Sequence, residues 1–278
     1  MEQQTKEWHE LRRRKIGASD APVIIGVSPW KTPLQLWEEK LGFREQPQRN
    51  SYMDRGIAME EPARMAFIEH TGIAVNPIVK ISSQFDFMMA SMDGLSNDEK
   101  TGVEIKCPGQ NDHTLASMGI IPDKYIPQLQ HQMFVCELET MYYYSFDGQD
   151  GVLLKVMRDE QYLSNLIEHE KEFYERMVNL EPPKPTERDY IKINDTNAVD
   201  KAKRIQVIRS KAKELSKEAD RLFDELVDET GFQQCEIGDV KITKVVRKGS
   251  ISYEQIPELK VIDLEKYRKE PSYHFRMS

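Results

Sequence analysis

The sequence predicts an α/β protein built of layers, and three observations support this prediction. A run of apolar and small residues at 87–95 is followed by a polar turn and a second short strand at 103–106, which is typical of a β-hairpin. Two further strand-like segments occupy 141–146 and 152–157. A helical segment at 160–180 carries apolar residues at helical spacing. Strands interleaved with helices pack as layers of sheet and helix.

Length and composition indicate one large folded domain with an appendage. The chain has 278 residues, of which 39% are hydrophobic and 31% are charged. No apolar run approaches the length of a membrane span, and the polar segment 1–10 leads us to expect no secretion signal. The three scattered cysteines indicate a reducing compartment and exclude a four-cysteine metal site made by this chain alone. The net charge of −8 argues against a nucleic-acid coat protein, although it permits an enzyme with clustered carboxylates.

A basic cluster lies near the start of the chain. The segment 8–15 is predicted to be helical and carries three arginines and a lysine, and Ser19 is expected to cap the element that follows. Arginine presents a planar fork of donors to phosphate oxygens, and a serine hydroxyl adds another donor. A turn at Gly17 would place Arg12 and Ser19 beside one terminal phosphate. The alternative is a solvated basic helix face with an ordinary cap.

Two tryptophans belong to the next segment. A loop is predicted at 28–33 and contains Trp30. An amphipathic helix is predicted at 34–41 and contains Trp37. We interpret both side chains as packing residues in preference to platforms for base stacking.

The helix predicted next, at 56–72, follows a polar loop at 43–54. Glu60 and Arg64 are one turn apart on this helix and share a face. An ion pair between them explains both residues adequately. The alternative is that Glu60 supplies a further carboxylate to a metal site.

The hairpin at 87–108 carries the residues with the most specific chemistry. Alternation along the second strand places Glu104 and Lys106 on one face, and Asp93 ends the facing strand close to Glu104. Magnesium prefers oxygen ligands and keeps several waters, so one or two carboxylates and a substrate phosphate suffice to hold it. A lysine beside such a cation can orient a water for attack on phosphorus. The hairpin therefore suits phosphodiester cleavage, and the alternative is a surface hairpin with scattered charges.

The segment after the hairpin contains two glutamines at helical spacing. Residues 109–119 are predicted to be a polar loop that covers the site, and a helix is predicted at 122–136. Gln128 and Gln132 are one turn apart on that helix. A buried amide needs hydrogen-bond partners. A glutamine directed at the lysine or at DNA is one interpretation, and surface exposure is the other.

The prolines at 182–185 mark a boundary, after which a long helix is predicted at 195–228. Its apolar residues repeat every seven positions over four heptads. Packing against the helix at 160–180, against a second copy of the chain or against another protein would each explain that pattern. A β-hairpin is predicted beyond it, with strands 236–246 and 250–256 around a basic turn.

Five motifs occur in an order that resembles a known family. They are Trp8-x-x-Leu11-Arg12 with Ala18-Ser19, Gly56-x-x-x-Glu60 with Ala63-Arg64, Asp93-Gly94-Leu95, Glu104-Ile105-Lys106-Cys107-Pro108, and Tyr125-x-x-Gln128-x-Gln130. Together they resemble the phage lambda exonuclease, or YqaJ-type viral recombinase, family of the PD-(D/E)xK nuclease superfamily. The resemblance covers about residues 5–180. Methionine stands where the superfamily pattern has proline before Asp93, but only the aspartate is chemically required.

The resemblance implies a restriction-endonuclease-like fold, in which helices flank a central mixed sheet. We therefore expect a nuclease domain at 1–185, a long heptad-patterned helix at 186–230 and a C-terminal extension at 231–278. It also implies a 5′-to-3′ exonuclease that digests one strand of duplex DNA from its ends. The products would be nucleotides and 3′ single-stranded tails for recombination.

The resemblance further implies roles for particular residues. Asp93 and Glu104 would ligate Mg²⁺, which Mn²⁺ is expected to replace, with the Ile105 carbonyl and Glu60 as further ligands. Lys106 would position or activate the attacking water. Gln128 matches an active-site glutamine. Arg12 and Ser19 match positions that grip the 5′-phosphate.

The family implies partners and a location as well. Members form ring-shaped trimers around DNA and work with a single-strand annealing protein, so we expect double-stranded DNA ends, that protein and further copies of the chain as partners. We expect no membrane association and a cytoplasmic location in a bacterial host that carries a phage or prophage. Two alternatives remain open: an endonuclease or a nuclease of other polarity in the same superfamily, and a catalytically silent scaffold that binds DNA ends.

Overall fold

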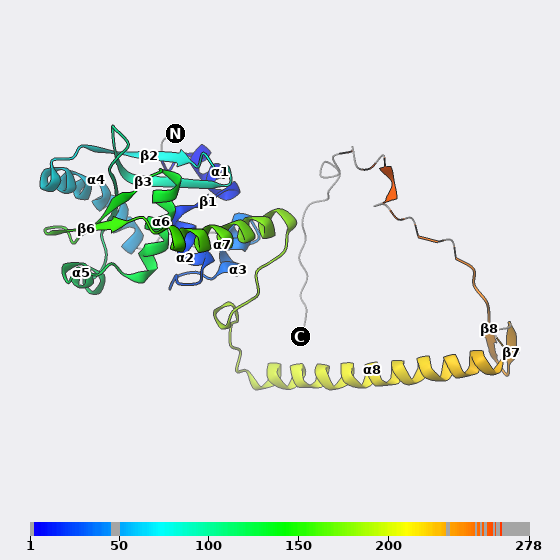
Figure 1. Ribbon diagram of the computed structural model, residues 1–278. Coiled ribbons are helices and arrows are strands. Elements are labelled where there is room, and N and C mark those ends of the chain that lie inside the picture. Colours follow the sequence, from blue (N-terminus) through cyan, green and yellow to red (C-terminus); the bar gives the residue numbers. More distant parts are fainter. Residues whose placement is uncertain are drawn as a thin grey trace. The chain divides into compact units, whose positions relative to one another are not determined.

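A mixed sheet forms the centre of the first of two units, Met1–Lys192 and Ile193–Ser278 (Figure 1). The computed structural model describes residues 3–45, 51–231, 234–247, 249–250, 252, 255–257, 259 and 262. The hydrogen-bonded strands follow the order β1-β3-β4-β5-β6. The sixth strand, β2, also pairs with β3 and lies outside this order. Its strands are β1 Ile16–Gly17, β2 Val75–Ile81, β3 Met88–Ser96, β4 Gly102–Lys106, β5 Thr140–Phe146 and β6 Gly151–Met157. β1 runs parallel to β3 and β4 parallel to β5, and the other pairs are antiparallel.

Helices cover both faces of this sheet. They are α1 Lys6–Arg14, α2 Ala21–Ile24, α3 Pro33–Lys40, α4 Ser51–Thr71, α5 Gln110–Ser117, α6 Ile126–Val135 and α7 Glu160–Asn179, with short 3-10 turns η1 Ala18–Asp20, η2 Asp123–Tyr125 and η3 Glu187–Asp189. Buried residues of α4 pack with Val103 and Ile105 of β4, whereas those of α6 and α7 pack with Met92 and Tyr143 from the other face. The predicted mixed α/β sheet flanked by helices is confirmed.

The register of the central hairpin positions its acidic residues. Gly94 pairs with Val103 and Leu95 with Gly102 in the antiparallel β3–β4 ladder. One step further along the ladder, Asp93 comes beside Glu104. A Cβ at Gly94 would lie 2.6 Å from the Val75 side chain of the neighbouring β2, so the residue after Asp93 has to be glycine for the three strands to meet.

Several elements differ from the sequence predictions. Residues 110–117 form α5 instead of a covering loop, and Ala116 of this helix is fully buried in the core. Ser19 does not cap a helix; it lies inside η1, whose N-cap is Gly17. Within the predicted loop 43–54, α4 begins at Ser51, while 46–50 lie outside the described residues. Apolar contacts favour helix at 110–117 where local composition favoured a loop.

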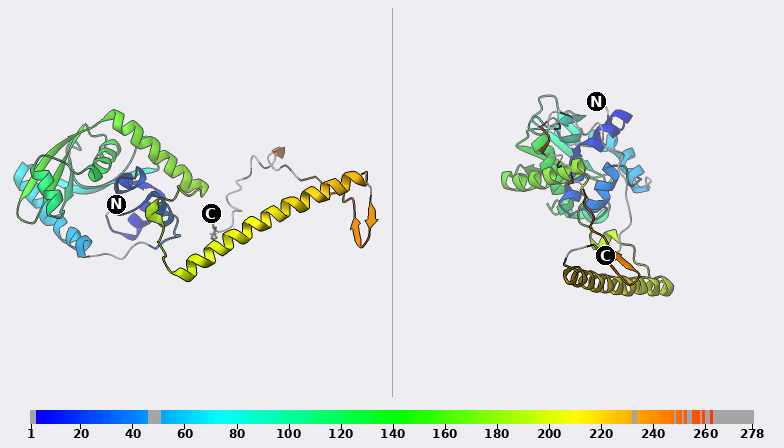
Figure 2. Two further views of the ribbon diagram at one scale, coloured as in Figure 1. Left: turned by 90° about the horizontal axis from the view of Figure 1, so that it is seen from below. Right: turned by 90° about the vertical axis from the view of Figure 1, so that its right-hand side faces the viewer.

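The second unit contains the predicted long helix and hairpin. α8 spans Thr196–Glu229, and the Asp195 side chain accepts a hydrogen bond from Ala198 N at 2.8 Å, which caps its start (Figure 2). The hairpin pairs β7 Cys235–Ile237 with β8 Val240–Ile242, so it turns at Gly238 and not at the predicted 247–250. Gly238 has φ +57°, a conformation that glycine adopts without strain. The predicted strands 236–246 and 250–256 are therefore wrong in position, with 251, 253 and 254 outside the described residues.

The division of the chain at 185 and 230 stays a prediction. No helix in the described ranges combines the length and the apolar character that crossing a membrane requires.

Candidate active site

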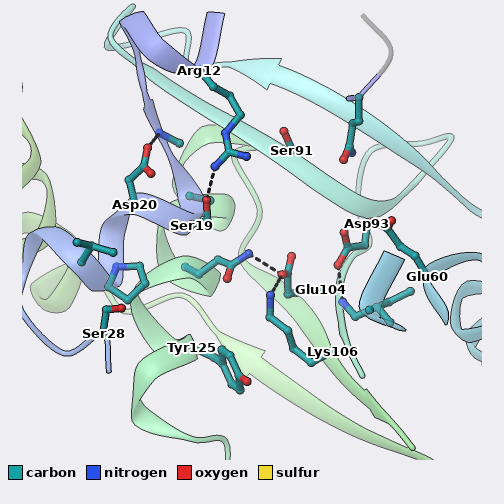
Figure 3. A pocket seen from close by; sticks show the side chains of 18 of the residues that line it. Arg12, Ser19, Asp20, Ser28, Glu60, Ser91, Asp93, Glu104, Lys106 and Tyr125 are labelled. Carbon is teal, nitrogen blue, oxygen red and sulfur yellow. Dashed lines mark hydrogen bonds and ion pairs between the residues drawn. The ribbon is translucent and has the colours of Figure 1, made fainter. Parts of the chain in front are cut away.

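Every site residue predicted from the sequence lines one cavity of about 670 Å³ in the first unit (Figure 3). These residues are Arg12, Ser19, Glu60, Asp93, Glu104, Ile105, Lys106 and Gln128. They come from α1, η1, α4, β3, β4 and α6, so the cavity is built by elements from across the unit. The fold therefore brings all of the predicted positions together.

Asp93, Glu104 and Lys106 lie together in the cavity, and we call these three residues the acidic centre. The Lys106 Nζ lies 2.5 Å from Glu104 Oε1, and Asp93 Oδ2 accepts a hydrogen bond from the Ile105 backbone N at 2.8 Å. The Glu104 side chain is almost fully buried, at 2% exposure for the residue. A buried carboxylate must be compensated by charge or hydrogen bonds. Lys106 supplies part of that compensation.

Burial and mutual repulsion govern the charges at this centre. Burial raises the pKa of Asp93 well above its usual range, and the neighbouring Glu104 carboxylate raises it further, as does Glu60. Burial opposes the positive charge of Lys106, but Glu104 and Asp93 outweigh it and raise the pKa of that ammonium. The centre is therefore short of positive charge, and the lysine stays protonated.

Two glutamines of α6 fix the orientation of Glu104. The Gln128 Nε2 donates to Glu104 Oε1 at 2.5 Å, and Gln132 Nε2 donates to Glu104 Oε2 at 2.5 Å. Gln132 is fully buried and also donates to the Ser91 carbonyl at 3.2 Å. Gln132 was not among the site residues predicted from the sequence. The signal in the sequence was its spacing of one helical turn from Gln128, which places both glutamines on the same side of α6.

Glu60 and Arg64 are not joined by the ion pair that their spacing suggested. Arg64 pairs with Glu61, and its Nη1 donates to the Asp93 carbonyl at 3.3 Å. Glu60 instead lies next to Asp93 on the cavity wall (Figure 3). Arg64 thus connects α4, the helix that carries Glu60, to β3 at Asp93.

Arg12 and Ser19 meet on another wall of the cavity. The Arg12 Nη2 donates to Ser19 Oγ at 2.8 Å, and the guanidinium lies over the Trp8 ring at 4.6 Å from its centroid. A buried ion pair between Lys40 and Asp20 also holds the backbone of Arg12 in place. Lys40 Nζ contacts Asp20 Oδ2 at 2.5 Å and donates to the Arg12 carbonyl at 2.6 Å. The Arg12 guanidinium is therefore held at a fixed place beside a hydroxyl.

The donor set suits a hard divalent cation. In the described ranges, no three histidine, cysteine, aspartate or glutamate side chains are arranged to hold a metal ion by themselves. Asp93 and Glu104 nevertheless face each other with unbalanced negative charge, and Ile105 and Glu60 add oxygen atoms to the same wall. Mg²⁺ needs only one or two carboxylates when water and a substrate phosphate complete its octahedron. The residues present fit Mg²⁺ better than a metal that requires nitrogen or sulfur ligands.

Comparison with known proteins gives one family and one fold. The model of the YqaJ-like viral recombinase domain matches residues 7–139. Uncharacterized protein YqaJ from Bacillus subtilis (strain 168) is 29% identical over 180 residues, which are 62% of this chain. The matched part spans 56% of the length of that relative.

Two crystal structures of an alkaline exonuclease, LHK-Exo from Laribacter hongkongensis, share the fold. One contains dAMP; it superimposes with a TM-score of 0.56 at 24% identity and covers 63% of this chain and 94% of the other. The second gives the same TM-score and coverage at 23% identity. The family match covers the elements that carry Arg12, Ser19, Glu60 and the central hairpin, as the ordered motifs predicted. Residues 7–139 of the chain are therefore similar to the YqaJ-like viral recombinase domain, and the first unit shares the fold of an alkaline exonuclease.

Proposed function

We propose that this protein is a divalent-metal-dependent deoxyribonuclease that digests one strand of duplex DNA from its 5′ end. The observation that carries the proposal is the convergence of Asp93, Glu104 and Lys106 with Arg12 and Ser19 in one cavity. The first three side chains suit hydrolysis of a phosphodiester, and the last two suit a terminal phosphate. The match to the YqaJ-like viral recombinase domain and the fold shared with an alkaline exonuclease are consistent with this activity.

Each residue has a distinct part in the proposed reaction. Asp93 and Glu104 hold Mg²⁺, with Glu60 and the Ile105 carbonyl as further oxygen donors, and Mn²⁺ is expected to substitute. The cation supplies Lewis-acid stabilisation of the negative charge that grows on the phosphate during attack. Lys106, which is protonated, donates to the attacking water and fixes its lone pair toward phosphorus. Gln128 and Gln132 hold both oxygens of Glu104 so that the carboxylate keeps one orientation.

The proposed polarity depends on Arg12 and Ser19. A guanidinium and a hydroxyl 2.8 Å apart offer several donors to one phosphate group. A terminal phosphate carries more charge than an internal one and has more oxygens to accept these bonds. Binding the 5′-phosphate here would place the first phosphodiester at the acidic centre, so hydrolysis would release 5′-mononucleotides and leave a 3′ single-stranded tail.

The biological setting is part of the same proposal. A 3′ tail is the substrate of a single-strand annealing protein, so such a protein is the expected partner in phage-type recombination. Further copies of the chain, arranged as a ring trimer, would keep the enzyme on its DNA. The setting would be the cytoplasm of a bacterium that carries the phage or prophage.

Incubation with labelled DNA and Mg²⁺ tests this function. The substrates are linear and circular duplexes of the same sequence, with the linear one labelled at its 5′ or its 3′ end. Early release of 5′-labelled mononucleotides from linear DNA alone is the expected result. Nicking of the circle would indicate an endonuclease, early release of the 3′ label would reverse the polarity, and binding without any product would indicate a scaffold.

A further inference from the structure

Trp30 is an exposed aromatic side chain on the rim of the cavity. The other two tryptophans of the chain, Trp8 and Trp37, are buried at 8% and 6% exposure, whereas Trp30 is 66% exposed. The interpretation of Trp30 as a packing residue is therefore wrong, and that of Trp37 is correct. An indole exposed beside a cavity needs an explanation that core packing does not provide.

Lys124 and Tyr125 support the Trp30 ring. The Lys124 Nζ lies 5.0 Å from the Trp30 ring centroid and 5.2 Å from that of Tyr125. The two ring centroids are 6.5 Å apart with an interplanar angle of 31°. Asp112 fixes both partners, because Lys124 Nζ is 2.7 Å from Asp112 Oδ2 and the Tyr125 hydroxyl donates to the same oxygen. We call Trp30, Lys124 and Tyr125 the aromatic shelf.

The loop that carries Trp30 is held rigidly by residues that follow α7. Arg188 donates to the Ser28 carbonyl at 2.9 Å and to the Pro29 carbonyl at 2.8 Å. The Thr32 hydroxyl donates to Asp189 Oδ1 at 2.5 Å. The backbone on both sides of Trp30 is thus fixed to a segment about 160 positions away in the sequence. A ring fixed in an exposed position is ready for a ligand without further loss of conformational freedom.

The shelf and the acidic centre belong to the same cavity. The cavity lining includes Trp30, Lys124 and Tyr125 together with Arg12 and Asp93. Lys106 connects the two regions, because its Nζ lies 5.4 Å from the Tyr125 ring centroid and 2.5 Å from Glu104. A nucleotide whose phosphate is at the acidic centre would therefore have its base, or that of its neighbour, near the shelf.

We propose that the exposed face of Trp30 stacks on an unpaired base of the strand that enters the cavity. The proposal rests on the proposed function and names what that function leaves open, namely how the strand is held once it leaves the duplex. All four bases can stack on an indole, because each has an aromatic face. Stacking therefore lets a nuclease bind the strand without sequence preference. The Lys124 ammonium lies against the Trp30 ring and adds positive charge near the bound strand.

Binding measurements without divalent cation test the shelf separately from cleavage. The probes are 5′-phosphorylated single-stranded oligonucleotides with a 3′ fluorophore, either complete or with one abasic site at positions 1 to 4 from the 5′ end. Trp30→Ala is expected to weaken binding of the complete probe roughly 5- to 100-fold. For the probe that lacks the stacked base, wild type and variant are expected to bind equally. Trp30→Phe should keep part of the affinity.

The matched control is Tyr190→Ala. Tyr190 is also 66% exposed but lies outside the cavity lining, so this variant should bind every probe as wild type does. Iodide quenching of wild-type fluorescence is a measurement that needs no variant. Trp30 is the exposed tryptophan, so the complete probe should shield it from iodide and the probe that lacks the stacked base should not.

Equal affinity of wild type and Trp30→Ala for the complete probe would overturn the shelf. The same holds if the variant loses the same affinity for every abasic probe, or if it changes the oligomeric mass in sedimentation, since Trp30 would then belong to a contact between copies. Failure of the proposed function gives a different result. Wild type would then fail to cleave DNA with Mg²⁺, while the binding comparison still decides on the shelf.

Discussion

Lys106 is the residue on which the chemistry depends most directly. Its ammonium lies 2.5 Å from Glu104 Oε1, and the Glu104 and Asp93 carboxylates raise its pKa, so it is positioned to donate a hydrogen bond. We predict that Lys106→Ala lowers the cleavage rate by at least about 100-fold, the lower bound for removal of one positioned hydrogen-bond donor. Affinity for duplex DNA should stay within about twofold of wild type, because the lysine is one charge among several phosphate contacts.

The measurement for Lys106 is single-turnover cleavage of a labelled duplex alongside anisotropy binding in Ca²⁺ or EDTA. Lys155→Ala is the matched control, since Lys155 is an exposed lysine of β6 outside the cavity lining. Turnover by Lys106→Ala close to that of the control would remove Lys106 from the proposed site.

Arg12 is predicted to set the preference for the 5′ end. Its guanidinium is held by Ser19 and by the Trp8 ring, so its donors reach the cavity in a fixed position. Hydrogen bonds to a charged group contribute about 1.5–3 kcal/mol, so Arg12→Ala should reduce the preference for phosphorylated over hydroxyl 5′ ends by roughly 10- to 100-fold. Competition between the two ends measures this preference. Arg14→Ala, an exposed arginine on the same helix, should keep it; an unchanged preference in Arg12→Ala would count against the phosphate site.

Side chains that alternate on a strand were more predictable than those on a buried helix. Glu104 and Lys106 follow from the two-residue period of β4. Asp93 was expected to end the facing strand, but β3 continues to Ser96, and the antiparallel pairing of the two strands brings Asp93 beside Glu104. Gln132 was noted beside Gln128 but was not assigned a role, because spacing alone does not tell which glutamine of a buried helix reaches the site; its contacts with Glu104 and Ser91 do. Trp30 was misjudged because sequence does not tell an exposed ring from a packed one.

At the scale of elements, a buried histidine joins α6 to the sheet and to α7. His131 Nδ1 lies 2.8 Å from Glu170 Oε1, and its Nε2 donates to the Met89 carbonyl at 2.9 Å. Both side chains are fully buried. The neighbouring α6 residue, Gln132, holds Glu104, so the position of α6 on the sheet affects the acidic centre.

This pair predicts how stability depends on pH. Burial opposes the charge of His131, but Glu170 outweighs it and raises the pKa of His131 above its usual value of about 6.5. A raised pKa in the folded state gives stability that is complete below about pH 6.5 and is lost as the pH rises through the folded pKa. In Glu170→Gln the carboxylate is absent, so this loss should disappear. The slopes of the two proteins should differ by up to about 1.4 kcal/mol per pH unit.

Urea unfolding between pH 6 and 9 measures this slope. Glu172→Gln is the control, because Glu172 lies two positions further along α7 and forms an exposed ion pair with Arg176. Its slope should match that of wild type. Parallel curves for wild type and Glu170→Gln would show that the buried pair does not set the dependence.

Local sequence decided some elements and tertiary contacts decided others. α3 was predictable because Thr32 caps it and Gly42 follows it at φ +78°. α5 was not, since its residues are polar and only Ala116 is buried in it. The hairpin of the second unit was misplaced because two glycine turns compete there, and the one at Gly238 is realised.

At the scale of the whole molecule, the apolar cores belong to the first unit. The clusters of buried hydrophobic side chains among the described residues all lie between Ile16 and Met177. No described residue of α8 is buried, and Ile208, Leu215 and Leu222 repeat every seven positions as exposed side chains. The heptad row predicted from the sequence is therefore an uncovered surface within its own unit, and its partner stays undetermined.

The end of the first unit is open to a direct test with two truncated chains. The sequence placed the boundary at 185, but Arg188 and Asp189 contact the loop of Trp30 and pack with the first unit, which extends to Lys192.

We predict that a chain of residues 1–192 unfolds at the same temperature as the first unit of the full protein and cleaves DNA as fast. A chain of residues 1–185 loses the three hydrogen bonds from Arg188 and to Asp189. At about 0.5–1.5 kcal/mol for each bond, the shorter chain should be less stable by roughly 1.5–4.5 kcal/mol. Differential scanning calorimetry and urea unfolding compare the chains, and the double variant Arg188→Ala/Asp189→Ala of the 1–192 chain separates the lost bonds from the lost length. Equal stability of the 1–185 and 1–192 chains would place the boundary where the prolines indicated, because the segment after α7 would then contribute nothing to the fold that positions Trp30.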